Sequence, residues 1–128
     1  MSSYLLDTTA LIDYSKGREP ARARIDAWIQ GGDDLGVCAI NVAEFYAGVL
    51  LPARAQWDHF FSLLHYWPIT LAAARQAGLW RHEFARRGVA LSIPDTLVAA
   101  VASDQRALLV TDNPKDYPMA GVQLVSLR

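Results

Sequence analysis

The chain has 128 residues, is 52% hydrophobic and 20% charged, and carries a formal net charge of −1. This length predicts one domain over residues 1–128 with enough apolar material for a core, which excludes a disordered or fibrous protein. The near-neutral charge excludes nucleic-acid binding through an overall basic surface. The sequence has no apolar run of membrane-spanning length and no signal-like leader, so we expect a cytoplasmic protein outside the membrane.

Apolar runs and helical periods alternate along the chain. In chain order we expect a strand at Tyr4–Leu6, a short helix from Thr9, a helix at Ala21–Gln30, a strand at Leu35–Ala39, helices at Val42–Leu50 and Ala53–His65, a short strand near Trp67–Ile69, helices at Leu71–Arg87 and Thr96–Arg106, and strands at Leu108–Thr111 and Val122–Leu127. This alternation is typical of an α/β fold, in which a mostly parallel sheet of four or five strands has helices on both faces.

The helix starts are predicted from residues that cap well. Asn41 is expected to cap one helix, with Glu44 in the capping-box position three residues later. Thr70 and Asp95 are expected to cap the two long helices in the second half of the chain. Gly88 is expected to end the first of these two helices.

Four acidic residues, Asp7, Glu44, Asp95 and Asp112, follow or interrupt apolar sequence at predicted strand ends and helix starts. In an open parallel sheet, the carboxyl ends of strands and the starts of the following helices lie at one edge. Each acid taken singly also suits a helix cap or a turn. Taken together, they are predicted to converge.

Clustered carboxylates repel one another unless a cation compensates for their charge. A set of oxygen ligands without a histidine partner favours Mg²⁺ or Mn²⁺ over zinc. Such ions bind phosphate oxygens and activate water. The cluster therefore points to metal-assisted hydrolysis of a phosphodiester.

The stretches LLDTTALIDY, AINVAEFYAG, ALSIPDTLVAAVA and LLVTDNPKDYP occur in this order over nearly the whole chain. They resemble the motifs of PIN-domain ribonucleases, and more narrowly those of the VapC toxins of bacterial VapBC toxin–antitoxin pairs. The resemblance implies a PIN domain that cleaves RNA with Mg²⁺ or Mn²⁺. It also implies that the pocket that binds the metal is formed by Asp7, Glu44, Asp95 and Asp112.

Further residues match the same motifs. Thr9 and Thr111 match hydroxyl positions that would orient a carboxylate or a metal-bound water, and Asn113 would shape the closing turn. Members of the family differ in where the closing carboxylate lies. Asp116, followed by an aromatic residue, therefore competes with Asp112 for the fourth position, and Asp112 is preferred.

Two surfaces are candidates for partners. The segment with Arg75, Arg81, Arg86 and Arg87 has only Glu83 as an acid, and it would contact RNA phosphates, dock a protein or remain solvated. The apolar stripe Trp57, Phe60, Phe61 and Leu64 is a candidate contact for a second copy or an antitoxin. The resemblance implies a homodimer inhibited by a VapB-type antitoxin. The RNA, whether transfer, ribosomal or messenger, is not identified.

Three alternatives compete with this interpretation. A phosphatase of the haloacid-dehalogenase type needs a second aspartate where this chain has Thr9. A phosphoacceptor receiver domain needs an aspartate at the end of its middle strand, and CAINVAEF has none there. A catalytically inactive PIN domain that binds RNA or protein stays open, although all four expected acids are present.

Overall fold

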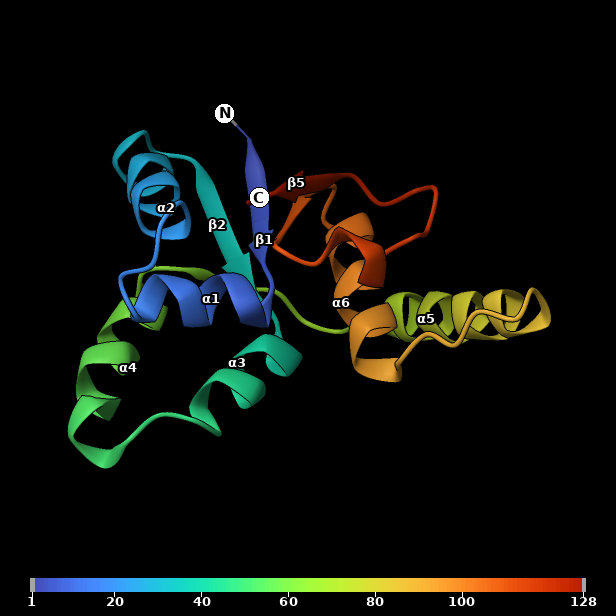
Figure 1. The fold of residues 1–128 in the computed structure, drawn as a ribbon, viewed down its shortest axis with the longest axis horizontal. Coiled ribbons are helices and arrows are strands. Elements are labelled where there is room, and N and C mark those ends of the chain that lie inside the picture. Colours follow the sequence, from blue (N-terminus) through green and yellow to red (C-terminus); the bar gives the residue numbers. More distant parts are fainter. Residues whose placement is uncertain (1, 128) are drawn as a thin grey trace.

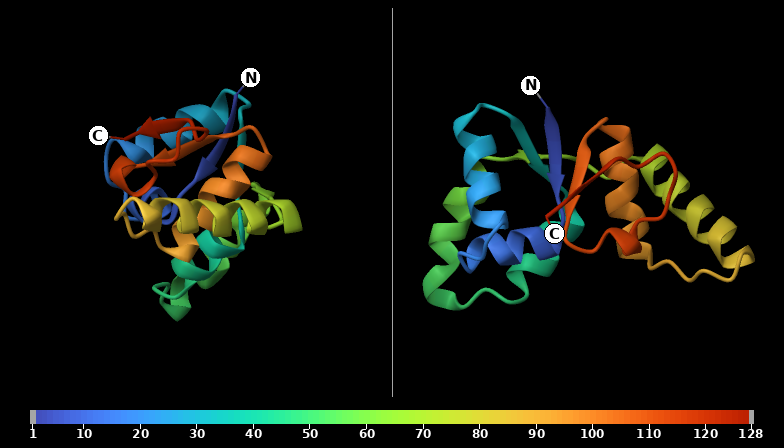
Figure 2. Two further views of the ribbon diagram at one scale, coloured as in Figure 1. Left: turned by 90° about the vertical axis from the view of Figure 1, so that its right-hand side faces the viewer. Right: turned by 45° about the horizontal axis from the view of Figure 1, so that its top comes forward.

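The computed structural model describes residues 2–127 and has a sheet between two layers of helices (Figures 1 and 2). Within these residues the elements are, in order, β1 (Ser3–Leu6), α1 (Thr8–Ser15), α2 (Ala21–Gln30), β2 (Asp34–Val37), α3 (Ala39–Tyr46), the 3₁₀ turn η1 (Leu51–Ala53), α4 (Arg54–Ser62), β3 (His65–Tyr66), α5 (Leu71–Arg86), α6 (Ile93–Asp104), β4 (Leu108–Thr111), the 3₁₀ turn η2 (Pro114–Asp116) and β5 (Leu124–Ser126). The predicted α/β class is confirmed.

The sheet has the order β3-β2-β1-β4-β5, and every neighbouring pair is parallel. The first strand is therefore the central one, with Leu5 opposite Gly36 on one side and Leu6 opposite Val110 on the other. The backbone N–H of Asp7 still donates to the carbonyl of Val110, at 3.1 Å. Asp7 is thus the residue at which the central strand leaves the sheet.

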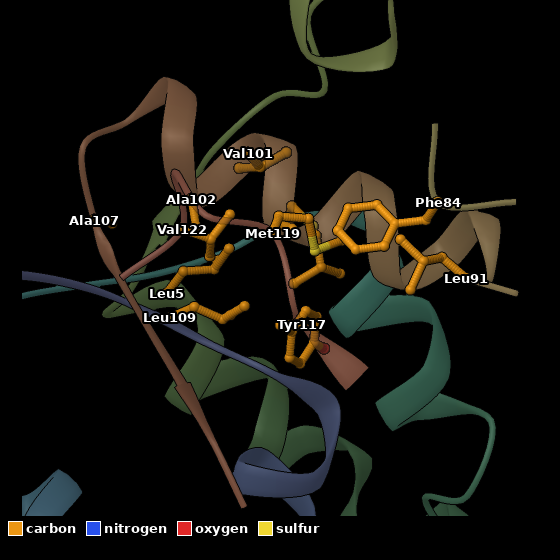
Figure 3. Close-up of a cluster of buried hydrophobic side chains, with 13 residues drawn as sticks. Leu5, Phe84, Leu91, Val101, Ala102, Ala107, Leu109, Tyr117, Met119 and Val122 are labelled. Atoms are coloured by element: carbon orange, nitrogen blue, oxygen red, sulfur yellow. The ribbon is translucent and has the colours of Figure 1, made fainter. Parts of the chain in front are cut away.

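Successive residues of β1 belong to two separate hydrophobic cores, because side chains alternate between the two faces of a strand. Leu5 packs with α6 and with residues from the loops after α5 and β4, as Figure 3 shows. Leu6 packs on the opposite face with residues of α1, α2, α3 and α4. Figure 1 shows this division, with α1–α4 on one side of the central strands and α5 and α6 on the other.

An aromatic cluster accounts for most of the apolar stripe of α4. Trp57 is 9% exposed, and Phe60 and Phe61 are half-buried. Trp57 and Phe60 lie against Tyr14 with ring centroids 6.4 and 5.0 Å away. Phe61 lies 5.2 Å from the ring of Phe45. These rings pack inside the chain, so they leave little of the stripe for a partner.

Several boundaries differ from the prediction. The helix after β2 begins at Ala39, with Cys38 as its N-cap, and it ends at Tyr46 rather than Leu50. The last long helix begins at Ile93 after its cap Ser92. Asn41 and Asp95 are therefore not caps, because each lies three residues after the capping position, inside the first turn.

Strand ends differ as well, whereas two helices agree closely with the prediction. β2 ends at Val37, and β3 is the pair His65–Tyr66 rather than Trp67–Ile69. The helix Ala21–Gln30 has the predicted bounds, and Thr70 caps α5 by accepting the N–H of Ala73 at 3.0 Å. No helix in the described part of the chain is long and apolar enough to cross a membrane.

Candidate active site

A cavity of about 230 Å³ lies where β1 ends and α1, α3 and α6 begin. Four carboxylates line it, and none of the lining residues is lysine or arginine. The lining residues are Asp7, Thr8, Thr9, Asn41, Glu44, Asp95, Val98, Asn113, Asp116 and Tyr117. The topology thus brings the first three predicted acids together from segments far apart in the sequence.

Asp7 is buried, at 4% exposure, and is the N-cap of α1. Its Oδ1 accepts the N–H of Ala10 at 2.8 Å and the hydroxyl of Thr9 at 2.9 Å. Burial raises the pKa of Asp7, hydrogen bonds from Thr111, Ala10 and Thr9 lower it, and the nearby charge of Asp112 raises it, so that the pKa lies above its ordinary value. The capping role and the position in the cavity therefore belong to one fixed carboxylate.

Glu44 reaches the cavity from α3 and is held by a residue that the motif analysis did not select. The Thr8 hydroxyl donates to Oε1 of Glu44 at 2.6 Å, which ties the first turn of α1 to α3. The expected capping-box pair of Asn41 and Glu44 is wrong. Asn41 is the N3 residue of α3, and its Oδ1 accepts the N–H of Cys38 at 3.2 Å.

Asp95 and Asp116 complete the carboxylate lining. Burial raises the pKa of Asp95, the Ser92 hydrogen bond lowers it, and the charges of Asp116 and Glu44 raise it further. Asp116 ends the short turn η2, which returns the chain toward the start of α6 after β4. The charged form of Asp95 is therefore disfavoured by burial and by these two neighbouring carboxylates.

Asp112, the preferred fourth acid, is not among the residues that line this cavity. It is half-buried and lines a different cavity, together with Asp13 and Arg18. Its charge reaches Asp7, as the pKa of Asp7 shows. Asp116, and not Asp112, thus lines this cavity with the other three acids, and the identity of the fourth ligand stays a prediction.

Two further residues of the closing motif, Thr111 and Asn113, lie at and just after the end of β4. Thr111 is fully buried, and its hydroxyl accepts the backbone N–H of Asn113 at 2.9 Å. Thr111 also lowers the pKa of Asp7. Asn113 lines the cavity, so this turn connects the end of β4 to the carboxylate of the central strand.

Tyr117 follows the closing acid and also lines the cavity. Burial and the negative charges around it raise its pKa far above the ordinary value for tyrosine. The acids that contribute are Asp7, Asp95, Asp116 and Glu44. The hydroxyl therefore keeps its proton and can donate a hydrogen bond.

The arginines selected from the sequence are exposed on α5 or just after it, and none of them lines the cavity. They are Arg75, Arg81, Arg86 and Arg87. Arg87 packs over the ring of Phe84, 4.1 Å from its centroid, and lies 3.9 Å from Glu83. A role of this helix in RNA binding stays a prediction.

The residues around the cavity fit a hard divalent cation. Carboxylates that face one space, two of them with raised pKa values, gain from a positive ion between them. Among residues 2–127, no three His, Cys, Asp or Glu side chains already lie close enough to hold a metal ion.

The profile of the PIN-domain family matches residues 4–118. Ribonuclease VapC19 of Mycobacterium tuberculosis is 28% identical over 115 residues, which are 90% of this chain and 92% of that protein. The fold is similar to VapBC2 from Rickettsia felis bound to a promoter DNA fragment, with a TM-score of 0.85 and 20% identity over 98% of this chain and 99% of that one. It is also similar to DNA-bound VapBC from Salmonella typhimurium, with a TM-score of 0.81 and 24% identity over 100% of both chains.

Proposed function

The chain belongs to the PIN-domain family, and from this premise we propose that it is an endoribonuclease that acts as the toxin of a VapBC-type toxin–antitoxin pair. The observation that carries the proposal is the cavity lined by Asp7, Glu44, Asp95 and Asp116 at the carboxyl end of the central strand. The similarity to a protein named as a VapC ribonuclease supports RNA as the substrate. We infer that one PIN domain accounts for residues 1–128 and that it works in the cytoplasm.

We propose Mg²⁺ or Mn²⁺ as the cofactor, held by these four carboxylates, with Asp112 as a further negative charge that acts on Asp7. When bound, such an ion supplies an activated water and stabilises charge on the phosphate. The chain supplies a rigid set of ligands. Thr9 holds Asp7, and Thr8 holds Glu44, so that neither carboxylate turns freely before substrate arrives.

We propose a VapB-type antitoxin as the inhibitor, because solved structures similar to this chain are VapBC complexes. A groove of about 260 Å³ lies beside the cavity and shares Glu44 with it. Its other walls include Phe45, Val49 and Trp57. An antitoxin segment with apolar side chains would fill this groove and reach the carboxylates. Exposed leucines such as Leu50, at 77%, and Leu63, at 67%, support a partner or a second copy.

The test is cleavage of a labelled total-RNA pool by purified protein freed of antitoxin, with Mg²⁺, Mn²⁺ or EDTA. Wild type is expected to give discrete fragments with either metal and none in EDTA. Asp7→Asn should abolish them, because the anionic ligand is lost while the cap acceptor is kept. Asp33→Asn is the matched control, since Asp33 precedes β2 at the opposite edge of the sheet. Folded wild-type protein without metal-dependent cleavage would instead favour an inactive PIN domain that only binds.

A further inference from the structure

The carboxylate cavity contains a buried donor that has no partner. Asn41 is fully buried, and its Oδ1 accepts both the backbone N–H and the Sγ–H of Cys38, at 3.2 and 3.3 Å. These two bonds orient the side-chain amide so that Oδ1 faces Cys38. Among the described residues, Nδ2 of Asn41 has no hydrogen-bond partner, although Asn41 lines the cavity.

A second donor lies on the same lining. Tyr117 is 6% exposed, and its ring packs in the core beside Met119 and the other apolar side chains of Figure 3. Tyr117 nevertheless lines the cavity, and in the described part of the chain its hydroxyl makes no hydrogen bond. The core thus holds the ring rigidly while the hydroxyl is left for another group.

Unsatisfied donors at such positions call for a ligand. A buried amide without a partner destabilises the folded protein, so native proteins rarely keep one without a use. The threonine hydroxyls of the cavity are already engaged, since Thr8 donates to Glu44 and Thr9 donates to Asp7. Among the side chains of this lining, Asn41 thus offers a buried donor without a partner, and Tyr117 offers a hydroxyl held by a buried ring.

A phosphodiester is the ligand that needs such donors here. Carboxylates only accept hydrogen bonds, so they offer nothing to the oxygens of a phosphate that are not bound to a cation. A lysine or arginine at this place would pair with the carboxylates and displace the cation. A neutral amide and a phenol donate to the phosphate without that competition.

We propose, building on the nuclease function, that Asn41 and Tyr117 are substrate-binding residues whose N–H and O–H groups donate to the non-bridging oxygens of the scissile RNA phosphate. The two donors come from different segments that line the cavity, one from the first turn of α3 and the other from the residue after η2. A phosphate between them would face both segments. The donors would thereby help to place the phosphate against the carboxylate set.

The first test compares cleavage kinetics of an RNA oligonucleotide that contains the mapped site. Asn41→Ala and Tyr117→Phe should each lower kcat/KM by about 10- to 100-fold, the range for a hydrogen bond to a charged group. Tyr117→Phe removes one oxygen and keeps the packed ring, so its melting temperature should stay near wild type. The metal concentration for half-maximal rate should not change. A rise in that concentration would mean that the residues support the carboxylates and not the phosphate.

A matched control removes a helix cap away from the cavity. Asn41 helps to cap α3, and Thr70→Ala removes the comparable bond to Ala73 in α5. Thr70→Ala should lose stability and keep its kcat/KM. If Thr70→Ala lost as much activity as Asn41→Ala, simple destabilisation would explain the effect and the inference would fall.

The decisive test replaces each non-bridging oxygen of the cleaved phosphate by sulfur in turn, with Mn²⁺ present throughout. A direct contact couples the two changes. Sulfur at one of the two oxygens should slow cleavage by the wild type. The same sulfur should have little further effect on cleavage by Asn41→Ala or Tyr117→Phe. Independent, multiplying losses would overturn the inference while leaving the nuclease function intact. Wild type that never cleaves RNA would overturn both.

Discussion

Gly36 in β2 is the position where an added methyl group should do the most damage for its size. A Cβ on Gly36 would lie 2.3 Å from Cζ3, 2.4 Å from Cε3 and 2.5 Å from Cη2 of Trp67. Carbon atoms in van der Waals contact are about 3.5–4.0 Å apart, so the overlap is on the order of 1 Å with three ring atoms. Gly36→Ala must therefore push the indole off the sheet.

The expected cost is about 1–3 kcal/mol, the range for overpacking a packed site. At about 4 °C per kcal/mol for a domain of this size, the melting temperature should fall by about 4–12 °C. The melting temperature is measured by circular dichroism during heating. Gly78→Ala is the matched control, because a Cβ on Gly78 meets nothing within 4 Å in the middle of α5. It should raise stability by about 0.5–1 kcal/mol, through helix propensity.

Adding Trp67→Leu tests the cause of the loss. The leucine removes the six-membered ring that the alanine would strike, so the two changes should be less than additive in Gly36→Ala/Trp67→Leu. Strict additivity, or a Gly36→Ala protein that melts at or above the wild-type temperature, would refute the close packing of the indole on β2.

The remaining predictions concern the cavity. Thr8→Val should lower the rate of RNA cleavage about 3- to 10-fold with little change in melting temperature, because the 2.6 Å bond to Glu44 is lost. Asp116→Asn should reduce cleavage more than Asp112→Asn, since only the former lines the cavity; the reverse order would return the fourth position to Asp112. Burial raises the pKa of folded Asp7, so in EDTA the stability of the wild type should fall as pH rises through that pKa. Asp7→Asn should then melt higher than wild type at neutral pH, and equal melting temperatures at every pH would contradict the argument.

The parts of the fold with strong local signals could be predicted. The apolar run at β4 and the bounds of α2 agree with the structure, because burial and helical period are visible in short windows. The start of α6 was missed for a physical reason. Ser92 and Asp95 both suit a cap and stand three residues apart, so local sequence does not separate the N-cap from N3. β3 is two exposed residues long and carries no pattern to detect.

The candidate site, too, could be predicted only where the local sequence or the strand order determines it. The approach of Asp7, Glu44 and Asp95 follows from where parallel strands end, so sequence reasoning predicted it. That Asp116 lines the cavity while Asp112 does not depends on the path of the turn η2 after β4, which the spacing of the motif does not give. The role of Thr8 depends on a partner 36 residues away, and adjacent threonines after an aspartate do not reveal which of them makes that contact.

The central place of β1 also bears on when the chain acquires its cavity during synthesis. The first strand to leave the ribosome has β4 as one of its two neighbours, and that edge stays open until residues 108–111 have been made. Asp116 is synthesised later still. A ribosome making this chain therefore carries an incomplete cavity through most of elongation. A nuclease of this design would be inert to the RNA around it until its own translation is nearly finished.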